Sequence, residues 1–104
     1  MQIFAMRLKR DIKVAGIQPE TILGMMVARS VCEVEGYEFC VTSVREGTHM
    51  SGSKHYTGHA FDMRTRDMPD ETKQRVRDDM AHRLGPDYDV VLESTHIHCE
   101  FDPK

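Results

Sequence analysis

Several features that mark common classes of protein are missing from this sequence. No apolar run comes near the ~20 residues needed to cross a bilayer, so we do not expect membrane insertion. The formal net charge is only −3, which gives no electrostatic basis for a nucleic-acid partner. There is no internal repeat, low-complexity tract or linker, and 104 residues suffice for one compact domain but not for two. We therefore predict a single domain over residues 1–104.

Cysteine is also scarce, and the N-terminus lacks the order of a secretory signal. Cys32, Cys40 and Cys99 have spacings that suggest neither a disulfide framework nor the CxxC pair of a structural zinc site. We expect three reduced thiols, buried as small core residues. The basic residues near the N-terminus follow a short apolar stretch, whereas a signal peptide has the reverse order. These features predict a protein that is cytoplasmic at synthesis.

Two segments have the pattern of amphipathic helices. The first is Pro19 to Glu35, with proline in the opening turn and Gly36 at its end. The second is Pro69 to Leu84, which Gly85 and Pro86 terminate. The apolar positions at helical spacing are Leu23, Val27, Val31 and Val34 in the first helix, and Val76, Met80 and Leu84 in the second. We predict that these stripes face the core.

The remaining ordered segments read as strands. The predicted strands are 37–44, 59–64, 88–92 and 95–101, and the last two are joined by a tight connection near Glu93 and Ser94. Residues 1–16 are left unassigned, because their apolar residues fit both a strand and a helix period. The element order predicts an α+β domain in which the helices pack on one face of a small antiparallel sheet.

Histidines and carboxylates gather in two short segments, residues 53–62 and 93–100. His96 and His98 are two residues apart on a predicted strand, so their side chains project from the same face. Cys99 then faces the core with Ile97, which argues against a hydrolase that uses Cys99 as its nucleophile. Two imidazoles on one face can bind a metal together, or one can bind while the other serves the reaction.

The first of these segments holds a second pair of possible ligands. His55 and Asp62 are seven residues apart, and a turn at Gly58 would allow both to reach one site. A catalytic zinc needs three ligands drawn from His and carboxylate, and a further carboxylate nearby to accept a proton. Glu93 precedes the histidine pair and could be that carboxylate. Spacing alone leaves a zinc site and ordinary surface histidines equally open.

The compound motif resembles a known family. Residues 53–62 match all five fixed positions of Ser-x-His-x-x-Gly-x-Ala-x-Asp, the pattern of zinc D-alanyl-D-alanine carboxypeptidases and related dipeptidases. Together with HIHC at 96–99, the segment is also similar to the signalling domain of hedgehog proteins, which shares that fold. The resemblance covers about residues 38–101 and is nearest to short peptidase-like proteins of bacteriophages and bacteria.

The resemblance implies a set of site residues. Its implied ligands for one zinc ion are His55, Asp62 and His98, with Glu93 as the general base. In some family members the glutamate lies three residues before the metal histidine, and that spacing would select His96 in place of His98.

Three further residues take roles from the resemblance alone. It implies that His49 lines the metal cleft and that His96 stabilises the transition state. Arg45 would match the arginine with which several family peptidases hold a substrate carboxylate.

The resemblance also implies a function. The expected activity is hydrolysis of peptide bonds next to D-alanine in the stem peptides of bacterial peptidoglycan, as in a phage lysis enzyme that acts on the cell wall once released. Carboxypeptidase and endopeptidase activity are both open. The alternative is a non-catalytic, zinc-containing binding or structural module of hedgehog type.

Overall fold

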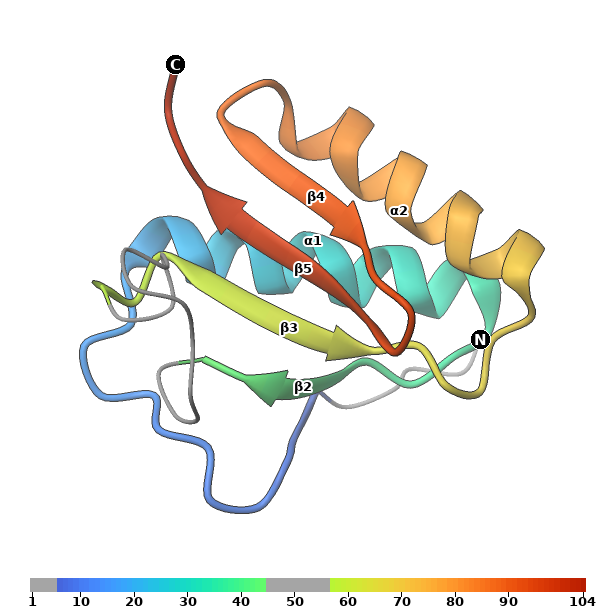
Figure 1. Cartoon of the computed structure of the whole chain (residues 1–104), viewed down its shortest axis with the longest axis horizontal. Helices are drawn as coiled ribbons and strands as arrows, with labels where there is room; N and C mark the ends of the chain where they lie inside the picture. Colours follow the sequence, from blue (N-terminus) through green and yellow to red (C-terminus); the bar gives the residue numbers. More distant parts are fainter. Residues whose placement is uncertain (1–5, 45–56) are drawn as a thin grey trace.

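The computed structural model describes residues 6–44 and 57–104. Its elements, in chain order, are β1 (Arg7–Leu8), α1 (Pro19–Glu35), β2 (Cys40–Ser43), β3 (Ala60–Arg64), α2 (Asp70–Leu84), β4 (Tyr88–Leu92) and β5 (His96–Phe101). The strands form one sheet in the order β1-β2-β3-β5-β4 (Figure 1). The predicted α+β class is confirmed.

The sheet is mixed, so the prediction of a purely antiparallel sheet is wrong at one edge. β1 pairs with β2 in parallel, whereas the other neighbouring strands are antiparallel. β1 lies in the segment that the sequence left unassigned. Two residues are too few to leave a recognisable strand period, which explains why its pattern was ambiguous.

Helix α1 has the predicted bounds because its end signals are local. Proline occupies the first turn, where its missing N–H costs no hydrogen bond, and Glu20 adds negative charge at the positive end of the helix dipole. Gly36 ends the helix in the left-handed conformation, with φ of 83°.

The predicted buried stripe of α1 is only partly correct. Val31 is buried and Val27 is half-buried, but Leu23 and Val34 are 53% and 71% exposed. The helix instead approaches the sheet through small residues, among them Gly24. A methyl group at Gly24 would lie 3.2 Å from Phe61 Cε1, so the missing side chain permits the close approach. The hydrophobicity of its residues alone therefore predicts the buried face of α1 incorrectly.

Helix α2 starts one residue later than predicted, with Pro69 in the N-cap position. Its predicted stripe is confirmed, since Val76 and Met80 are buried and Leu84 packs against the core. Both helices contribute to the same hydrophobic cluster as Phe61, Met63, Val90, Ile97 and Cys99 of the sheet. Figure 1 shows α1 passing behind β3 and β5, with α2 beside β4. The helices thus cover one face of the sheet, as predicted.

The predicted strands are confirmed in kind, with small changes in length. β4 has the predicted bounds, whereas β3 and β5 each begin one residue later than expected. β2 is shorter than the predicted 37–44, yet Phe39 just before it is buried and packs edge-to-face on Phe61 at 6.0 Å. Among the described residues, no helix is both long and apolar enough to span a membrane.

Candidate functional site

The pairing of β3 with β5 assembles the candidate site on the face of the sheet opposite the helices. Asp62 is the direct partner of His98, and Arg64 is the partner of His96. Because side chains alternate along a strand, these residues share one face, while the intervening Met63 and Ile97 are fully buried on the other. The prediction that His96 and His98 project together is therefore confirmed.

His98 lies between two carboxylates. Its Nδ1 atom is 3.0 Å from Asp62 Oδ1, and its Nε2 atom is 2.7 Å from Glu100 Oε1. His96 Nε2 lies 3.8 Å from the other Asp62 oxygen, and its Nδ1 atom is 3.0 Å from Thr95 Oγ1. Asp62 thus joins the two imidazoles, and all three side chains are only partly exposed to solvent.

The two carboxylates change the charge preference of His98. A neutral imidazole has one donor and one acceptor nitrogen, so only its protonated form can donate to both carboxylates at once. The hydrogen bond to Asp62 raises the pKa of His98, burial opposes the increase, and the hydrogen bond to Glu100 adds to it. The site therefore favours a positive charge between Asp62 and His98, which a proton or a metal cation can supply.

Glu100 is a site residue that the sequence analysis missed. It stands two residues after His98 on β5, so the same period that paired the histidines could have placed it on their face. Histidines that bind metals usually donate their other ring N–H to a carboxylate or carbonyl, which fixes the tautomer and the ring orientation. Glu100 is in position to do this for His98.

The predicted general base stands at the rim of the site. The Glu93 N–H donates to the His96 carbonyl at 2.8 Å and closes the tight turn that was predicted between β4 and β5. The register of the hairpin thus sets Glu93 opposite His96. The side chain is exposed, and within the described ranges its carboxylate makes no hydrogen bond to Asp62, His96 or His98.

Three of the predicted site residues, Arg45, His49 and His55, lie outside the described residues. Of the chain between His55 and Asp62, residues 57–61 are described. Gly58 has a φ of 78°, a conformation that side-chain-bearing residues rarely adopt, as expected of a turn glycine. The turn predicted at Gly58 is therefore confirmed.

The donor chemistry of the described residues fits a zinc ion. Two ligands at ~2.0–2.1 Å from a tetrahedral zinc lie about 3.3 Å apart, close to the 3.0 Å between Asp62 Oδ1 and His98 Nδ1. Carboxylate and imidazole are also ligands that zinc accepts. Asp62 and His98 thus have the donor atoms for two of the three protein ligands that a catalytic zinc takes.

An acidic cluster adjoins the histidine site and shares Glu100 with it. Asp89, Glu100 and Asp102 are the one group of three possible metal ligands, within 4.8 Å of one another, in the part of the chain that the structure describes. The Lys104 ammonium lies 3.2 Å from Asp89 Oδ1 and 3.4 Å from Asp102 Oδ2. A cationic side chain thus already sits at the cluster and balances part of its charge.

Cys32 and Cys99 are poor candidates for a nucleophile. Cys32, Cys40 and Cys99 are free and buried, as the sequence predicted. Burial raises the pKa of the Cys32 and Cys99 thiols to about 12, so both are protonated near neutral pH. The hydrolase that would use Cys99 is disfavoured.

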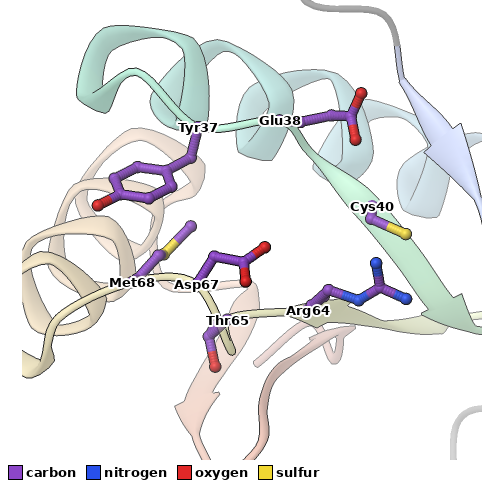
Figure 2. Close-up of a pocket in the computed structure, with 7 residues that line it drawn as sticks. All are labelled: Tyr37, Glu38, Cys40, Arg64, Thr65, Asp67 and Met68. Atoms are coloured by element: carbon purple, nitrogen blue, oxygen red, sulfur yellow. The ribbon is translucent and has the colours of Figure 1, made fainter.

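A small pocket adjoins the histidine site where β2 begins and β3 ends. Figure 2 shows the Arg64 side chain reaching toward Cys40 in this pocket, with Tyr37, Glu38 and Asp67 around it. Since Arg64 is the register partner of His96, the pocket borders the histidine site. Glu38 is paired with Arg7 at 3.0 Å, so that carboxylate already has a cationic partner.

No family model matches the chain, and no curated protein matches it.

Proposed function

We propose that this chain is a zinc-dependent peptidase that hydrolyses peptide bonds next to D-alanine in peptidoglycan stem peptides. The observation that supports the metal site is the 3.0 Å approach of Asp62 Oδ1 to His98 Nδ1, with Glu100 behind the imidazole. The substrate class comes from the resemblance of the motif at 53–62 to the zinc carboxypeptidases.

Three side chains would hold the ion: His55, Asp62 and His98. A bound zinc would lower the pKa of a water molecule toward ~7 and polarise the carbonyl of the bond to be cut. The Asp62 carboxylate offsets one of its two positive charges, and Glu100 would keep the His98 ring oriented. His96 would not bind the ion in this arrangement, although Asp62 holds it nearby.

The reaction would then depend on proton transfers by the chain. Glu93 would accept a proton from the attacking water and pass it to the departing amine as the carbon–nitrogen bond breaks. His96 would donate a hydrogen bond to the carbonyl oxygen as negative charge develops there; loss of such a donor costs ~10²-fold in rate. The resemblance adds His49 as a lining residue of the cleft and Arg45 as an anchor for a substrate carboxylate.

The test is digestion of defined muropeptides by the zinc-loaded protein, followed by mass analysis of the fragments. We expect cleavage next to D-alanine by the wild type, loss of cleavage with retention of zinc in Glu93→Gln, and normal behaviour in the control His82→Ala. His82 is exposed on α2, on the other side of the sheet from Asp62 and His98. Full cleavage by Glu93→Gln would remove the assigned base and contradict this mechanism.

A second candidate function is a non-catalytic zinc-containing binding module. The exposed position of Glu93 favours it, because a general base must be held beside the water from which it takes a proton. Such a module would bind zinc with the same ligands and leave every muropeptide intact. The digestion experiment thus separates the two functions.

A further inference from the structure

The turn that leads into Asp62 is attached to the first turn of helix α1. The Gly58 carbonyl accepts two hydrogen bonds, one from the Thr21 hydroxyl at 2.7 Å and one from the Gln18 backbone N–H at 3.1 Å. Thr21 is 2% exposed, and 37 residues separate it from Gly58. A buried hydrogen bond to a backbone carbonyl at this distance along the chain is a strong constraint on the turn.

Close backbone packing reinforces the attachment. A methyl group on Gly58 would lie 2.3 Å from the Gly16 carbonyl oxygen and 3.1 Å from Ile17 Cα. The positive φ of Gly58 adds a second reason for glycine at this position. The turn therefore packs this closely against the segment that precedes α1 only with glycine at position 58.

The other side of the turn is attached to strand β5. The Phe101 N–H donates to the His59 carbonyl at 2.8 Å, and the two rings stack with centroids 6.4 Å apart. The Tyr88 ring packs on Phe101, and its hydroxyl donates to the Glu20 carbonyl in the first turn of α1 at 2.7 Å. The start of α1 and the end of the sheet thus hold Gly58 and His59 between them.

The position of this turn matters because of what it connects. Gly58 lies three residues after His55 and four residues before Asp62, so it belongs to the only covalent link between these two proposed ligands. A metal binds more tightly when its ligands are held in place before it arrives, because less conformational entropy is then lost on binding.

We infer that the Thr21 hydroxyl is a positioning group for the metal site: by holding the Gly58 carbonyl, it presets the turn at Gly58, which lies between His55 and Asp62 in the sequence. Thr21 touches neither the metal nor the substrate in this arrangement and acts through the backbone of the turn. This inference rests on the proposed zinc site and adds helix α1 to the machinery that forms it.

The chain offers a closely matched control. Thr21 is the third residue of α1 and Thr72 is the third residue of α2, and both are buried, at 2% and 6% exposure. The Thr72 hydroxyl accepts a hydrogen bond from Arg75 within its own helix, at 3.1 Å. Removal of either hydroxyl disturbs a buried first turn, but only that of Thr21 releases Gly58.

The experiment measures the apparent zinc Kd of folded protein by competition with a chelator, in wild type, Thr21→Val, Thr21→Ser and Thr72→Val. We expect Thr21→Val to weaken zinc binding about tenfold or more, as loss of outer groups around metal sites does. Thr21→Ser keeps the hydroxyl and should stay near the wild-type value, as should Thr72→Val. Equal Kd values for Thr21→Val and Thr72→Val would overturn the inference while leaving the zinc site intact, whereas a wild type that binds no zinc would overturn both.

Amide hydrogen exchange of the wild-type protein gives a second test that does not depend on folding of a variant. Zinc binding should slow exchange of the Gln18 N–H, which donates to Gly58 at 3.1 Å, more than that of the Lys73 N–H, which donates to Pro69 at 3.0 Å in the first turn of α2. Equal effects of zinc on the two amides would contradict the inference.

Discussion

Asp62 and His98 are direct register partners on β3 and β5, and their side chains meet at 3.0 Å on the face of the sheet opposite the helices. The backbone ladder on either side of them fixes the spacing, so the pair is part of the sheet rather than of a loop. A site on regular structure holds its groups more accurately than a site on loops.

The first prediction concerns zinc content. Purified protein should retain about one zinc per chain after dialysis, and Asp62→Ala and His98→Ala should each lose it, because two ligands rarely suffice for a zinc site. Metal analysis against protein concentration provides the measurement. His82→Ala should keep its zinc, and a stoichiometric ion in His98→Ala would exclude His98 as a ligand and favour His96.

The second prediction concerns Glu100. Glu100→Ala should weaken zinc binding by about 10–100-fold, because the His98 ring loses the carboxylate that receives its second N–H. Glu100→Gln should lose less, since an amide oxygen can still accept that hydrogen bond. The exposed Glu71 on α2 offers a control for removal of one negative charge, through Glu71→Ala. A zinc Kd that is the same in Glu100→Ala and Glu71→Ala would mean that Glu100 does not orient His98.

The third prediction concerns the thiols. Cys32 and Cys99 should resist iodoacetamide at pH 8 in the native protein, because burial blocks access and raises each thiol pKa to about 12. In denaturant both should react, and mass spectrometry of the peptides distinguishes the sites. Rapid native alkylation of Cys99 with loss of peptidase activity would instead revive a cysteine nucleophile.

The fourth prediction concerns the contact of α1 with the sheet. Gly24→Val should lower the free energy of unfolding by about 1–3 kcal/mol, because the new side chain must displace the Phe61 ring or the helix itself. Met26→Val introduces the same residue on the exposed side of α1 and should change stability by only about half a kcal/mol. Urea denaturation of both variants gives the comparison, and a Gly24→Val protein as stable as Met26→Val would show that α1 can shift without cost.

The fifth prediction concerns the ion pair between the helices. Arg75 on α2 donates to both oxygens of Glu35 at the end of α1, and these hydrogen bonds lower the pKa of Glu35. A lowered pKa in the folded state means that the pair stabilises above the unfolded-state pKa and that this stability is lost as the pH falls through the folded-state pKa. Wild type should therefore exceed Glu35→Gln in stability at pH 7 by a small margin, and the two should converge in acid, as thermal unfolding across a pH series would show. Because the pair is exposed, added salt should also reduce the margin.

The sequence predicted the elements whose signals are local. Pro19 and Gly36 mark the two ends of α1, and the alternation of His96, Ile97, His98 and Cys99 identifies both faces of β5. The failures arise where the signal depends on a distant neighbour. Leu23 has the hydrophobicity of a core residue, but the sheet contacts Gly24 instead, because Phe61 needs the space that glycine leaves.

In the candidate site, too, features with a local signal could be predicted, and features that depend on a distant residue could not. The projection of His96 and His98 from one face of the strand could be predicted, since it depends only on the strand period. The contact between Thr21 and Gly58 could not, because 37 residues separate two positions with no pattern in common. The face of Glu100 could also be predicted, because it stands two residues after His98 on the same strand.

The alternation along β5 also links the site to the folding of the domain. A shift of β5 by one residue against β3 would bring both imidazoles into the hydrophobic layer and turn Ile97 and Cys99 toward water. Such a misaligned chain would lose its core and its metal pair together. Hydrophobic packing against the helices therefore selects the register that the site requires, because the alignment that buries Cys99 also places His98 beside Asp62.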